Sequence, residues 1–391
     1  MIPLAIKQMK IVADFETTTD PDDVRVWAVC AVDIETAETV FLSNSLDEFL
    51  DWLSDKNTVC YFHNLRFDLE FILPNVLKRG FTFSRKHEPK TFDCLISDHG
   101  VVYSFTLYFS KETKKYRKVT FYDSYKKLPF RVANISKAFQ LKDEKLVIDY
   151  DAPRPVGHDL TEEEKAYIVN DCRIVAQALK IQFDQGMKKM TVASDAMHGY
   201  KQIITKDQFD YQFPTFPIML DDDIRKAYKG GFVYVNPKYQ GVEISEGEQY
   251  DVNSLYPWTM YSCLLPYGYP MYFEGEPEPS AKFPLFIVRL RCSFTIKPGY
   301  IPTIQMKKSG WFVSTEYLTS SEGRIVELTL TNVDLKLFLD HYDVLNLEYI
   351  KGWRFKGVVG LFKEYIDYWM HIKETNEGPL RQLAKLMLNS L

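Results

Sequence analysis

The alternation of hydrophobic and polar positions divides the chain into strand-like and helix-like stretches. From Lys10, the sequence KIVADFETTT has the apolar, β-branched lead of a strand. Residues 65–77, LRFDLEFILPNVL, carry apolar residues at helical spacing soon after an apolar run that ends at Phe62. The stretches SFTLYF and KVTFYDSYKKLPF indicate two strands that form a hairpin around a basic block, followed by a turn at Pro129.

The clearest helical pattern is LTEEEKAYIVNDCRIVAQALKIQF, residues 160–183. It opens with Thr161 and Glu164 at the spacing of a capping box, and apolar residues then recur with the period of a helix. Tyr167 and Asp171 are one turn apart and therefore share a face. A phenol and a carboxylate can thus reach the same bound group.

Three patterns organise the second half of the chain. DVNSLYPWTM, residues 251–260, predicts a strand that ends in a turn and exposes Asp251 beside a helix start. Residues 261–357 are rich in proline and aromatic residues, and PLFIVRLRCSF and RIVELTLTNV within them predict strands of an α+β accessory region. The last stretch, from Leu361, predicts two helices with a break at Glu377 and Gly378. Because the helical pattern still runs at Leu391, we expect more chain to follow.

Composition narrows the class of protein. A chain of 391 residues, 46% of them hydrophobic, is long enough for two or three domains. No apolar run approaches the length of a membrane span, and the start MIPLAIKQMK is too short in apolar residues for a signal peptide, so we expect a cytoplasmic protein. The six cysteines form no CxxC pair and are expected to be reduced core thiols.

Charge is unevenly distributed along the chain. The net charge is −5, but residues 351–391 carry 7 bases and 4 acids, and Lys111–Lys118 forms a second basic block. A polyanion could therefore be held locally by a protein that is acidic as a whole. The simpler interpretation of each lysine is a solvated charged face. Aromatic residues make up 15% of the chain and suit stacking on single-stranded nucleic acid, although most are expected in the core.

Four acidic residues are candidates for a metal site. Asp14 and Glu16 point to the same face of the first strand, because side chains alternate along a strand. With 53 acidic residues in the chain, about seven such pairs arise by chance, so this pair alone indicates little. Asp68 on the first turns of a helix and Asp171 on a later helix would complete a set of four carboxylates, which suits two divalent ions. Without metal, four clustered acids would repel one another.

The motifs that carry these acids resemble a known family. DFE, YFHNLRFD and YIVND are similar to the three exonuclease motifs of DEDD-type proofreading domains. The surrounding sequence resembles the protein-primed family B DNA polymerases of the bacteriophage phi-29 type. This resemblance covers essentially the whole chain and includes DSYKKLPF, RPVGH, AYKGGF, DVNSLYP, YIPTIQ and QLAKLMLNSL.

The resemblance implies roles in an exonuclease site. Asp14, Glu16, Asp68 and Asp171 would bind Mg²⁺ or Mn²⁺, Tyr167 would orient the attacking water, and Lys145 would support the phosphate. Tyr125 departs from the family pattern, which has leucine there. Core packing is the alternative for each aromatic residue. The residues matching positions that contact the single-stranded 3′ end are Thr17, Tyr61, His63, Asn64, Phe67, Ser124, Tyr125, Phe130 and Tyr150.

The resemblance also implies part of a polymerase site. Asp251 and Val252 would bind the polymerase metal, and the ring of Tyr256 would exclude a 2′ hydroxyl. For Gly230 and Gly231 a plain tight turn is the alternative, and for the lysines it is solvated helix charge. The template-primer residues would be Tyr228, Gly230, Gly231, Asn253 and Ser254, and the nucleotide-binding residues Tyr256, Lys373, Lys385 and Asn389, with Arg381 beside them.

These implications define an expected α/β (α+β multidomain) architecture. A ribonuclease H-like exonuclease domain with a mixed sheet would span residues 1–190, a palm segment 191–260, an insertion that contacts the priming protein and duplex 261–359, and a fingers fragment 360–391. The expected function is that of a DNA-directed DNA polymerase with a 3′→5′ exonuclease that replicates a linear viral or plasmid DNA.

A single carboxylate cannot complete a two-metal polymerase site, so we expect this chain alone to retain exonuclease activity and DNA binding. Its expected partners are DNA, deoxynucleotides, a terminal priming protein and possibly a second chain that supplies the rest of the polymerase, with no membrane. One alternative is a noncatalytic module that binds single-stranded DNA or a priming protein. Another is a stand-alone nuclease, for which DVNSLYP and KLMLNSL would have no purpose.

Overall fold

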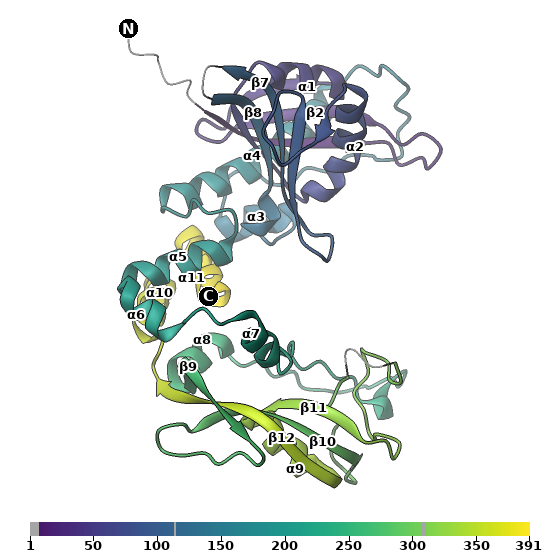
Figure 1. The fold of residues 1–391 in the computed structure, drawn as a ribbon. Helices are drawn as coiled ribbons and strands as arrows, with labels where there is room; N and C mark the ends of the chain where they lie inside the picture. The colour runs from purple at the N-terminus through teal and green to yellow at the C-terminus, as the bar shows by residue number, and fades with distance from the viewer. Residues whose placement is uncertain (1–7, 113–114, 307–309) are drawn as a thin grey trace. The chain divides into compact units, whose positions relative to one another are not determined.

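A computed structural model describes residues 8–112, 115–306 and 310–391 of the chain, which Figure 1 draws as a ribbon. The chain packs into two compact units. The first unit comprises Met1–Tyr200 and Asp367–Leu391, and the second comprises Lys201–Ile366. The four functional segments expected from the sequence, with boundaries after residues 190, 260 and 359, stay a prediction.

The first unit is built on a mixed eight-stranded sheet with the order β3-β2-β1-β4-β8-β7-β6-β5. Strand β1 (Met9–Thr17) pairs antiparallel with β2 (Val26–Asp33) and parallel with β4 (Thr58–Phe62). The hairpin expected from the sequence is confirmed as the antiparallel pair of β7 and β8, although Thr113 and Lys114 of its basic block lie outside the described residues. The remaining strands are β3 (Thr39–Ser43), β5 (Thr82–Phe83), β6 (Thr91–Ile96), β7 (Val102–Glu112) and β8 (Lys115–Asp123).

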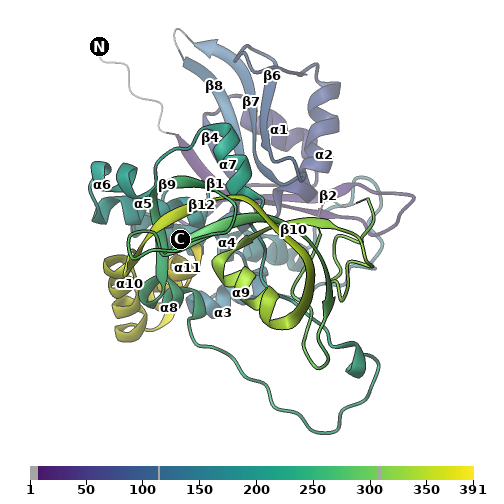
Figure 2. The ribbon, with the colours of Figure 1, turned by 60° about the horizontal axis from the view of Figure 1, so that its bottom comes forward.

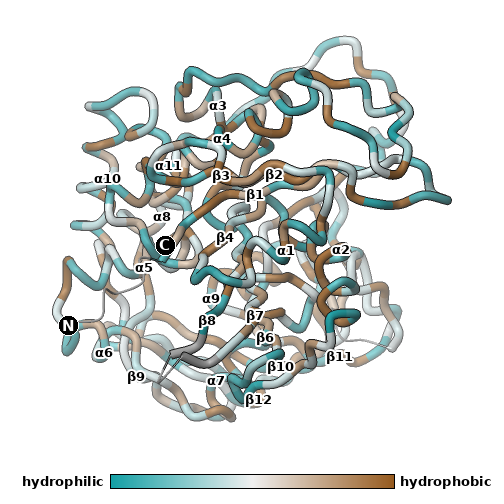
Figure 3. The backbone as a smooth tube through the Cα atoms, turned by 90° about the horizontal axis from the view of Figure 1, so that it is seen from above, coloured by the Kyte–Doolittle hydropathy of each residue, from teal (hydrophilic) through white to brown (hydrophobic). Residues whose placement is uncertain are grey.

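Helices cover both faces of this sheet. Ile11, Ala13 and Phe15 of β1 belong to a core cluster shared with α1 (Leu46–Ser54) and α2 (Leu65–Lys78). The long helix α4 (Glu162–Asp184) packs on the opposite face of β1 and β2, because Cys172 lies against Cys30. Figure 3 shows the hydrophobic colouring that runs along β1 and β2 between these layers. The sheet therefore presents its β1 face, with Asp14 and Glu16, to α4.

The predicted helix over residues 160–183 is confirmed together with its capping box. The Thr161 hydroxyl accepts a hydrogen bond from the Glu164 N–H, and the Glu164 carboxylate accepts one from the Thr161 N–H. The two C-terminal helices are confirmed as well, and the second begins at Gly378, one residue inside the break predicted at Glu377 and Gly378. The other elements of the first unit are η1 (Ser124–Lys126), α3 (Val132–Phe139), α5 (Val192–Ile203), α10 (Lys363–Thr375) and α11 (Gly378–Ser390), with α5 and α10 running across the unit boundaries.

The second unit is built on an antiparallel four-stranded sheet with the order β11-β10-β12-β9. The two predicted strands are confirmed as β10 (Leu285–Ile296) and β11 (Val326–Thr331). Helix α9 (Asn332–His341) packs against β10, β11 and β12, and Figure 2 shows it beside β10. The remaining elements are α6 (Lys206–Gln212), α7 (Ile218–Arg225), η2 (Pro237–Tyr239), α8 (Leu255–Ser262), β9 (Leu264–Glu274) and β12 (Tyr342–Val359).

The strand predicted before Asp251 was wrong. Residues 240–252 are irregular, because the described part of the chain offers them no strand to pair with. The helix start predicted after Asp251 is confirmed: α8 begins at Leu255, after Ser254 in a left-handed conformation with φ 54°. Within the described residues, we find no helix whose length and apolar character would let it cross a bilayer.

Candidate metal centre

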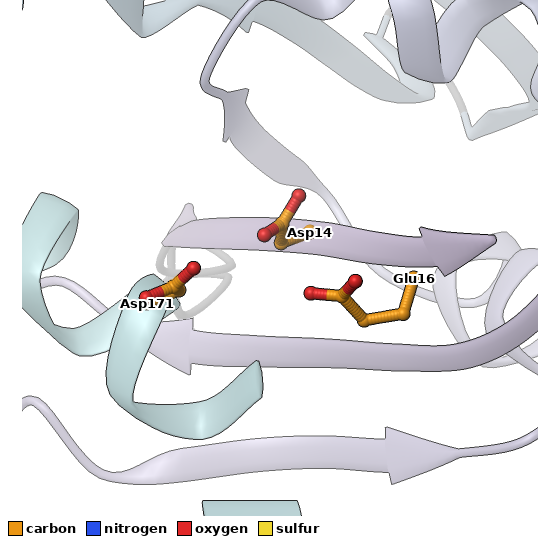
Figure 4. Close-up of side chains that lie close together, drawn as sticks. All are labelled: Asp14, Glu16 and Asp171. Atoms are coloured by element: carbon orange, nitrogen blue, oxygen red, sulfur yellow. The ribbon is translucent and has the colours of Figure 1, made fainter. Parts of the chain in front are cut away.

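Strand β1 aims two carboxylates at helix α4. Asp14 and Glu16 pair with Cys30 and Ala28 of β2, so both alternate with the core residues Ala13 and Phe15 and point away from α1 and α2. Asp171 projects from the third turn of α4 toward them, as Figure 4 shows. One oxygen from each of these three carboxylates lies within 4.8 Å of the others. The convergence that the sequence predicted for these three acids is therefore observed.

The fourth predicted acid, Asp68, lies beside this group without belonging to it by the same distance criterion. It sits on the first turn of α2, is 2% exposed, and its Oδ1 has no hydrogen-bond partner. Burial raises the pKa of Asp68 well above its ordinary value, and Asp14 is the charge that raises it most. Asp68 is therefore a close electrostatic neighbour of Asp14.

The buried carboxylates of this cluster repel one another. Burial, followed by the charge of Asp171, raises the pKa of Asp14 to about 7. Burial and the charges of Asp14 and Asp171 raise the pKa of Glu16 to about 8. The Oδ1 of Asp171, like that of Asp68, is buried without a partner. Hard divalent cations such as Mg²⁺ and Mn²⁺ prefer carboxylate oxygens and would relieve this repulsion, so the donor set fits such ions.

A cation and two phenols border the carboxylates. Lys145 forms an ion pair with Asp171, and this interaction raises the pKa of Lys145 although partial burial opposes it. Its Nζ also lies 5.0 Å from the ring centroid of Tyr167. The phenol oxygens of Tyr167 and Tyr150 form a hydrogen bond. Burial and this bond raise the pKa of Tyr167, so its phenol stays protonated.

The polar residues predicted to contact a DNA 3′ end meet where β4 and β8 end. His63 bonds through Nε2 to the carbonyl oxygen of Phe130 (2.7 Å) and through Nδ1 to Ser124 Oγ (3.0 Å). Burial lowers the pKa of His63 and favours the neutral ring. Asn64 is exposed and takes a left-handed conformation with φ 77°, and Thr17 lies partly buried at the end of β1.

Four of the five predicted aromatic contacts divide into two groups, and the fifth, Phe130, is partly buried. Phe67, Tyr125 and Tyr150 are 45%, 42% and 46% exposed, so their rings are open to stacking. Tyr61 is 9% exposed and packs against Tyr122 and Phe183. The alternative of core packing therefore describes Tyr61, because β4 lies in the middle of the sheet and its side chains are enclosed on both faces.

The predicted polymerase residues fall in both units. Asp251, Val252, Asn253 and Tyr256 are exposed in the second unit, with Ser254 partly buried among them. Gly230 and Gly231 lie in an irregular stretch without an assigned turn, and neither glycine has a positive φ. Tyr228 next to them is 77% exposed. Lys373, Lys385 and Asn389 belong to α10 and α11 of the first unit, where Arg381 donates a hydrogen bond to the Lys373 carbonyl oxygen (2.7 Å).

Two buried residues near the site were missed by the sequence analysis. Asp123 accepts hydrogen bonds from the N–H groups of Asn64 and Tyr125, both 3.0 Å, and so ties the ends of β4 and β8 together. Arg154 lies between β2 and α4 with its guanidinium on Glu164 (2.8 Å). Asp123 stands directly before Ser124, and an aspartate in that place is an N-cap signal that could have indicated its role. Arg154 opens the RPVGH motif, but residue spacing does not indicate that its side chain is buried.

Comparison with known proteins identifies the class. Residues 51–154 and 148–391 match the profile of the family described as DNA polymerase type B, organellar and viral. The chain therefore belongs to the type B DNA polymerases.

Among its relatives, the DNA polymerase of Bacillus phage phi29 is 49% identical over 378 residues, covering 97% of this chain and 66% of the relative. The DNA polymerase of Streptococcus phage Cp-1 is 32% identical, and the match covers 97% of this chain and 68% of that polymerase. The structure titled Phi29 DNA polymerase complexed with single-stranded DNA superimposes with a TM-score of 0.93 at 47% identity, over 98% of this chain and 67% of that one. The chain thus spans about two thirds of the length of the phage polymerases it resembles.

Proposed function

We propose that this chain is a 3′→5′ exonuclease that trims the single-stranded 3′ end of DNA with divalent ions, Mg²⁺ or Mn²⁺. The observation that carries the proposal is the convergence of Asp14, Glu16 and Asp171 within 4.8 Å at the interface of β1 and α4. Oxygen donors at this spacing with raised pKa values are difficult to explain as a structural feature, because repulsion destabilises them. A solved relative is titled as a complex with single-stranded DNA, which supports the substrate.

Each residue of the site has a distinct task in this proposal. Ions held by Asp14, Glu16, Asp68 and Asp171 would lower the pKa of a water and stabilise a leaving 3′ oxygen. Tyr167 holds its phenol proton and can orient the water, while the Lys145 ammonium faces the phosphate. The exposed rings of Phe67 and Tyr125 would stack on the last bases, and Asn64 and Thr17 would contact sugar or phosphate.

The experiment is degradation of a 5′-labelled single-stranded oligonucleotide with Mg²⁺ or Mn²⁺. Wild type should shorten it from the 3′ end, and a chelator should stop it. Asp98→Ala changes an exposed acid outside the carboxylate cluster. It serves as the matched control for variants of the cluster and should degrade the oligonucleotide as wild type does. Tight single-strand binding that ignores the chelator, with no trimming, would instead favour a noncatalytic binding module.

We further propose that the complete protein is a protein-primed DNA polymerase acting in the cytoplasm of a bacterial host. Support comes from family membership and from the phage origin of the relatives. Asp251 and Val252 would bind the polymerase metal, Tyr256 would exclude ribonucleotides, and a terminal protein would provide the priming hydroxyl. The remaining assignments for template-primer and nucleotide contacts are part of the same proposal.

The second unit has a surface that suits a completing polypeptide. Val233, Val235 and Tyr250 are 78%, 69% and 84% exposed in a stretch with no strand partner among the described residues. The same unit also has an apolar pocket of about 800 Å³, lined in part by residues of α7 and β9. Exposed β-prone backbone invites strand addition by another polypeptide. We take that polypeptide to be the part of the phage polymerases that lies beyond the region matched here.

Complementation tests this second proposal. The chain is mixed with a separately expressed C-terminal third of a phi29-type relative, and primer extension and amide exchange are measured. Extension should appear only in the mixture, together with protection of residues 229–252 from exchange. Extension by the chain alone, or no new protection in the mixture, would contradict it.

A further inference from the structure

The guanidinium of Arg154 is enclosed between β2, the strand next to β1, and α4, the helix that carries Asp171. Its side chain is 4% exposed and lies over the ring of Trp27 at 4.2 Å. Trp27 belongs to β2, which pairs with the β1 strand that bears Asp14 and Glu16. On the other side, Arg154 Nε donates to Glu164 Oε1 at 2.8 Å, in the first turn of the helix that bears Asp171.

The same guanidinium holds the backbone that carries Tyr150. Nη1 donates to the carbonyl oxygens of Tyr150 (3.3 Å) and Ala152 (3.2 Å), and Nη2 donates to that of Asp149 (2.7 Å). All three guanidinium nitrogens therefore have acceptors. The Tyr150 phenol in turn bonds to the Tyr167 phenol. The enclosed Arg154 guanidinium thus holds the backbone of Tyr150, a half-exposed residue whose phenol reaches Tyr167.

The helix cap on this network does not need Arg154. The other carboxylate oxygen of Glu164 accepts hydrogen bonds from the Thr161 N–H (3.0 Å) and from His158 Nε2 (2.7 Å). The start of α4 therefore keeps its cap when the guanidinium is changed. The change instead removes hydrogen bonds from residues 149–152, because a lysine ammonium cannot donate in one plane to three separate carbonyls and a carboxylate.

We infer that Arg154 is a positioning residue for the metal centre: through the backbone of Tyr150 it holds the Tyr150 phenol on Tyr167. The inference rests on the proposed exonuclease function for its kinetic consequence, but the geometry stands without it. It also gives a task to the arginine of the RPVGH motif, which the proposed chemistry leaves unused.

A double-mutant cycle in the oligonucleotide assay tests the inference. Arg154→Lys and Tyr150→Phe should each lower kcat about 10- to 100-fold with little change in KM, as for other groups that orient a metal site. Both substitutions act through the hydrogen bond between the Tyr150 and Tyr167 phenols. The double variant should therefore be no slower than the slower single variant. Independent effects that multiply in the double variant would overturn the inference.

The matched control is Arg79→Lys. Arg79 also makes side-chain hydrogen bonds, to Asn75 Oδ1 (2.8 Å) and Asp47 Oδ1 (2.7 Å). These bonds link α1 to α2 and do not involve Asp14, Glu16 or Asp171. Its kcat and KM should equal those of wild type. A loss equal to that of Arg154→Lys would mean that any weakened arginine clamp in this unit slows the reaction, and would also overturn the inference.

A second readout needs neither metal nor DNA. With ¹³Cζ-labelled tyrosine, the Tyr167 resonance should move in Arg154→Lys to the position it takes in Tyr150→Phe, and stay in place in Arg79→Lys. An unmoved Tyr167 resonance in a folded Arg154→Lys refutes the positioning role. If wild type degrades no oligonucleotide, the exonuclease proposal fails while this resonance still decides the inference.

A neutral pair covers the case in which the lysine variant does not fold. Arg154→Gln combined with Glu164→Gln removes both buried charges together, so that neither is left buried without its partner. The double glutamine variant lacks the fork toward residues 149–152, so it should show the same displaced Tyr167 resonance. An unchanged resonance would again refute the inference.

Discussion

Asp14 and Asp251 are both acids for which the sequence predicts a metal-binding role, yet their surroundings differ. Asp14 lies on a strand paired on both sides, opposite a helix that brings Asp171 to it. Asp251 is exposed in an irregular stretch, and among the described residues no second carboxylate joins it in such a group. Convergence of like charges requires a scaffold that holds them against their repulsion. The first unit has that scaffold in its sheet, whereas residues 240–252 of the second unit lack a partner strand.

The largest expected effect concerns the carboxylate cluster of the first unit. Asp14→Ala removes one of the three converging carboxylates and should reduce oligonucleotide degradation on the order of 10⁴-fold, about 5 kcal/mol of transition-state stabilisation. The rate is measured with Mg²⁺ and with Mn²⁺, with Asp98→Ala as the control. A residual rate near that of wild type would show that this pocket is not where the ions act.

The next effect compares buried and exposed ion pairs in the two units. The Lys127 ammonium, with a fully buried side chain, pairs with Asp195 and also donates to the Lys189 carbonyl oxygen (3.0 Å). Lys127→Met leaves Asp195 buried without its cation and should destabilise the first unit by about 3 to 5 kcal/mol. Lys351 pairs with Asp223 at 2.8 Å in the second unit, where both side chains are partly exposed. Lys351→Met should cost less than about 1 kcal/mol.

Urea unfolding followed by amide exchange separates the two units, since one global transition is not assumed. Peptides of β1 and α4 report the first unit, and peptides of β10 report the second. Equal destabilisation by Lys127→Met and Lys351→Met would contradict the difference expected between the buried ion pair of the first unit and the partly exposed pair of the second.

A smaller effect concerns acid stability of the first unit. Burial alone would raise the pKa of Glu164. Hydrogen bonds from Thr161, His158 and Arg154 outweigh burial and lower this pKa from 4.5 to about 2. The ionised form therefore stabilises the fold above about pH 4.5, and this contribution is lost as the pH falls from 4.5 toward 2. Glu164→Gln should lower the unfolding free energy by about 2 kcal/mol at neutral pH. Below pH 4.5 the gap between wild type and variant should close, and a gap independent of pH would contradict the assignment.

The mildest test changes no residue. Amides of β1, which are bonded within the sheet, should exchange far more slowly than those of residues 229–236, which have no regular hydrogen bonding among the described residues. Hydrogen exchange of the unmodified chain measures both. Similar protection of the two segments would mean that the second unit is as well ordered there as the sheet of the first.

Local patterns in the sequence predicted much of this architecture. The capping box at Thr161 and Glu164, the β7–β8 hairpin and the break at Gly378 follow from interactions over a few residues, and all three are observed. The same alternation placed Asp14 and Glu16 on one face. Family resemblance added the roles of these residues, which spacing alone does not determine. The strand before Asp251 failed because strand formation depends on a partner that local sequence does not reveal.

The sequence by itself determined most of the elements that hold the candidate site residues, because periodicity, caps and turns act between near neighbours. Only the tertiary structure decided that α4 lies on the β1 face opposite α1 and α2, which brings Asp171 to Asp14 across more than 150 residues of chain. It also decided that Tyr61 is core while Phe67 is open, and that Arg154 is enclosed. These outcomes depend on which surfaces exclude water together, and that is a property of the packed chain.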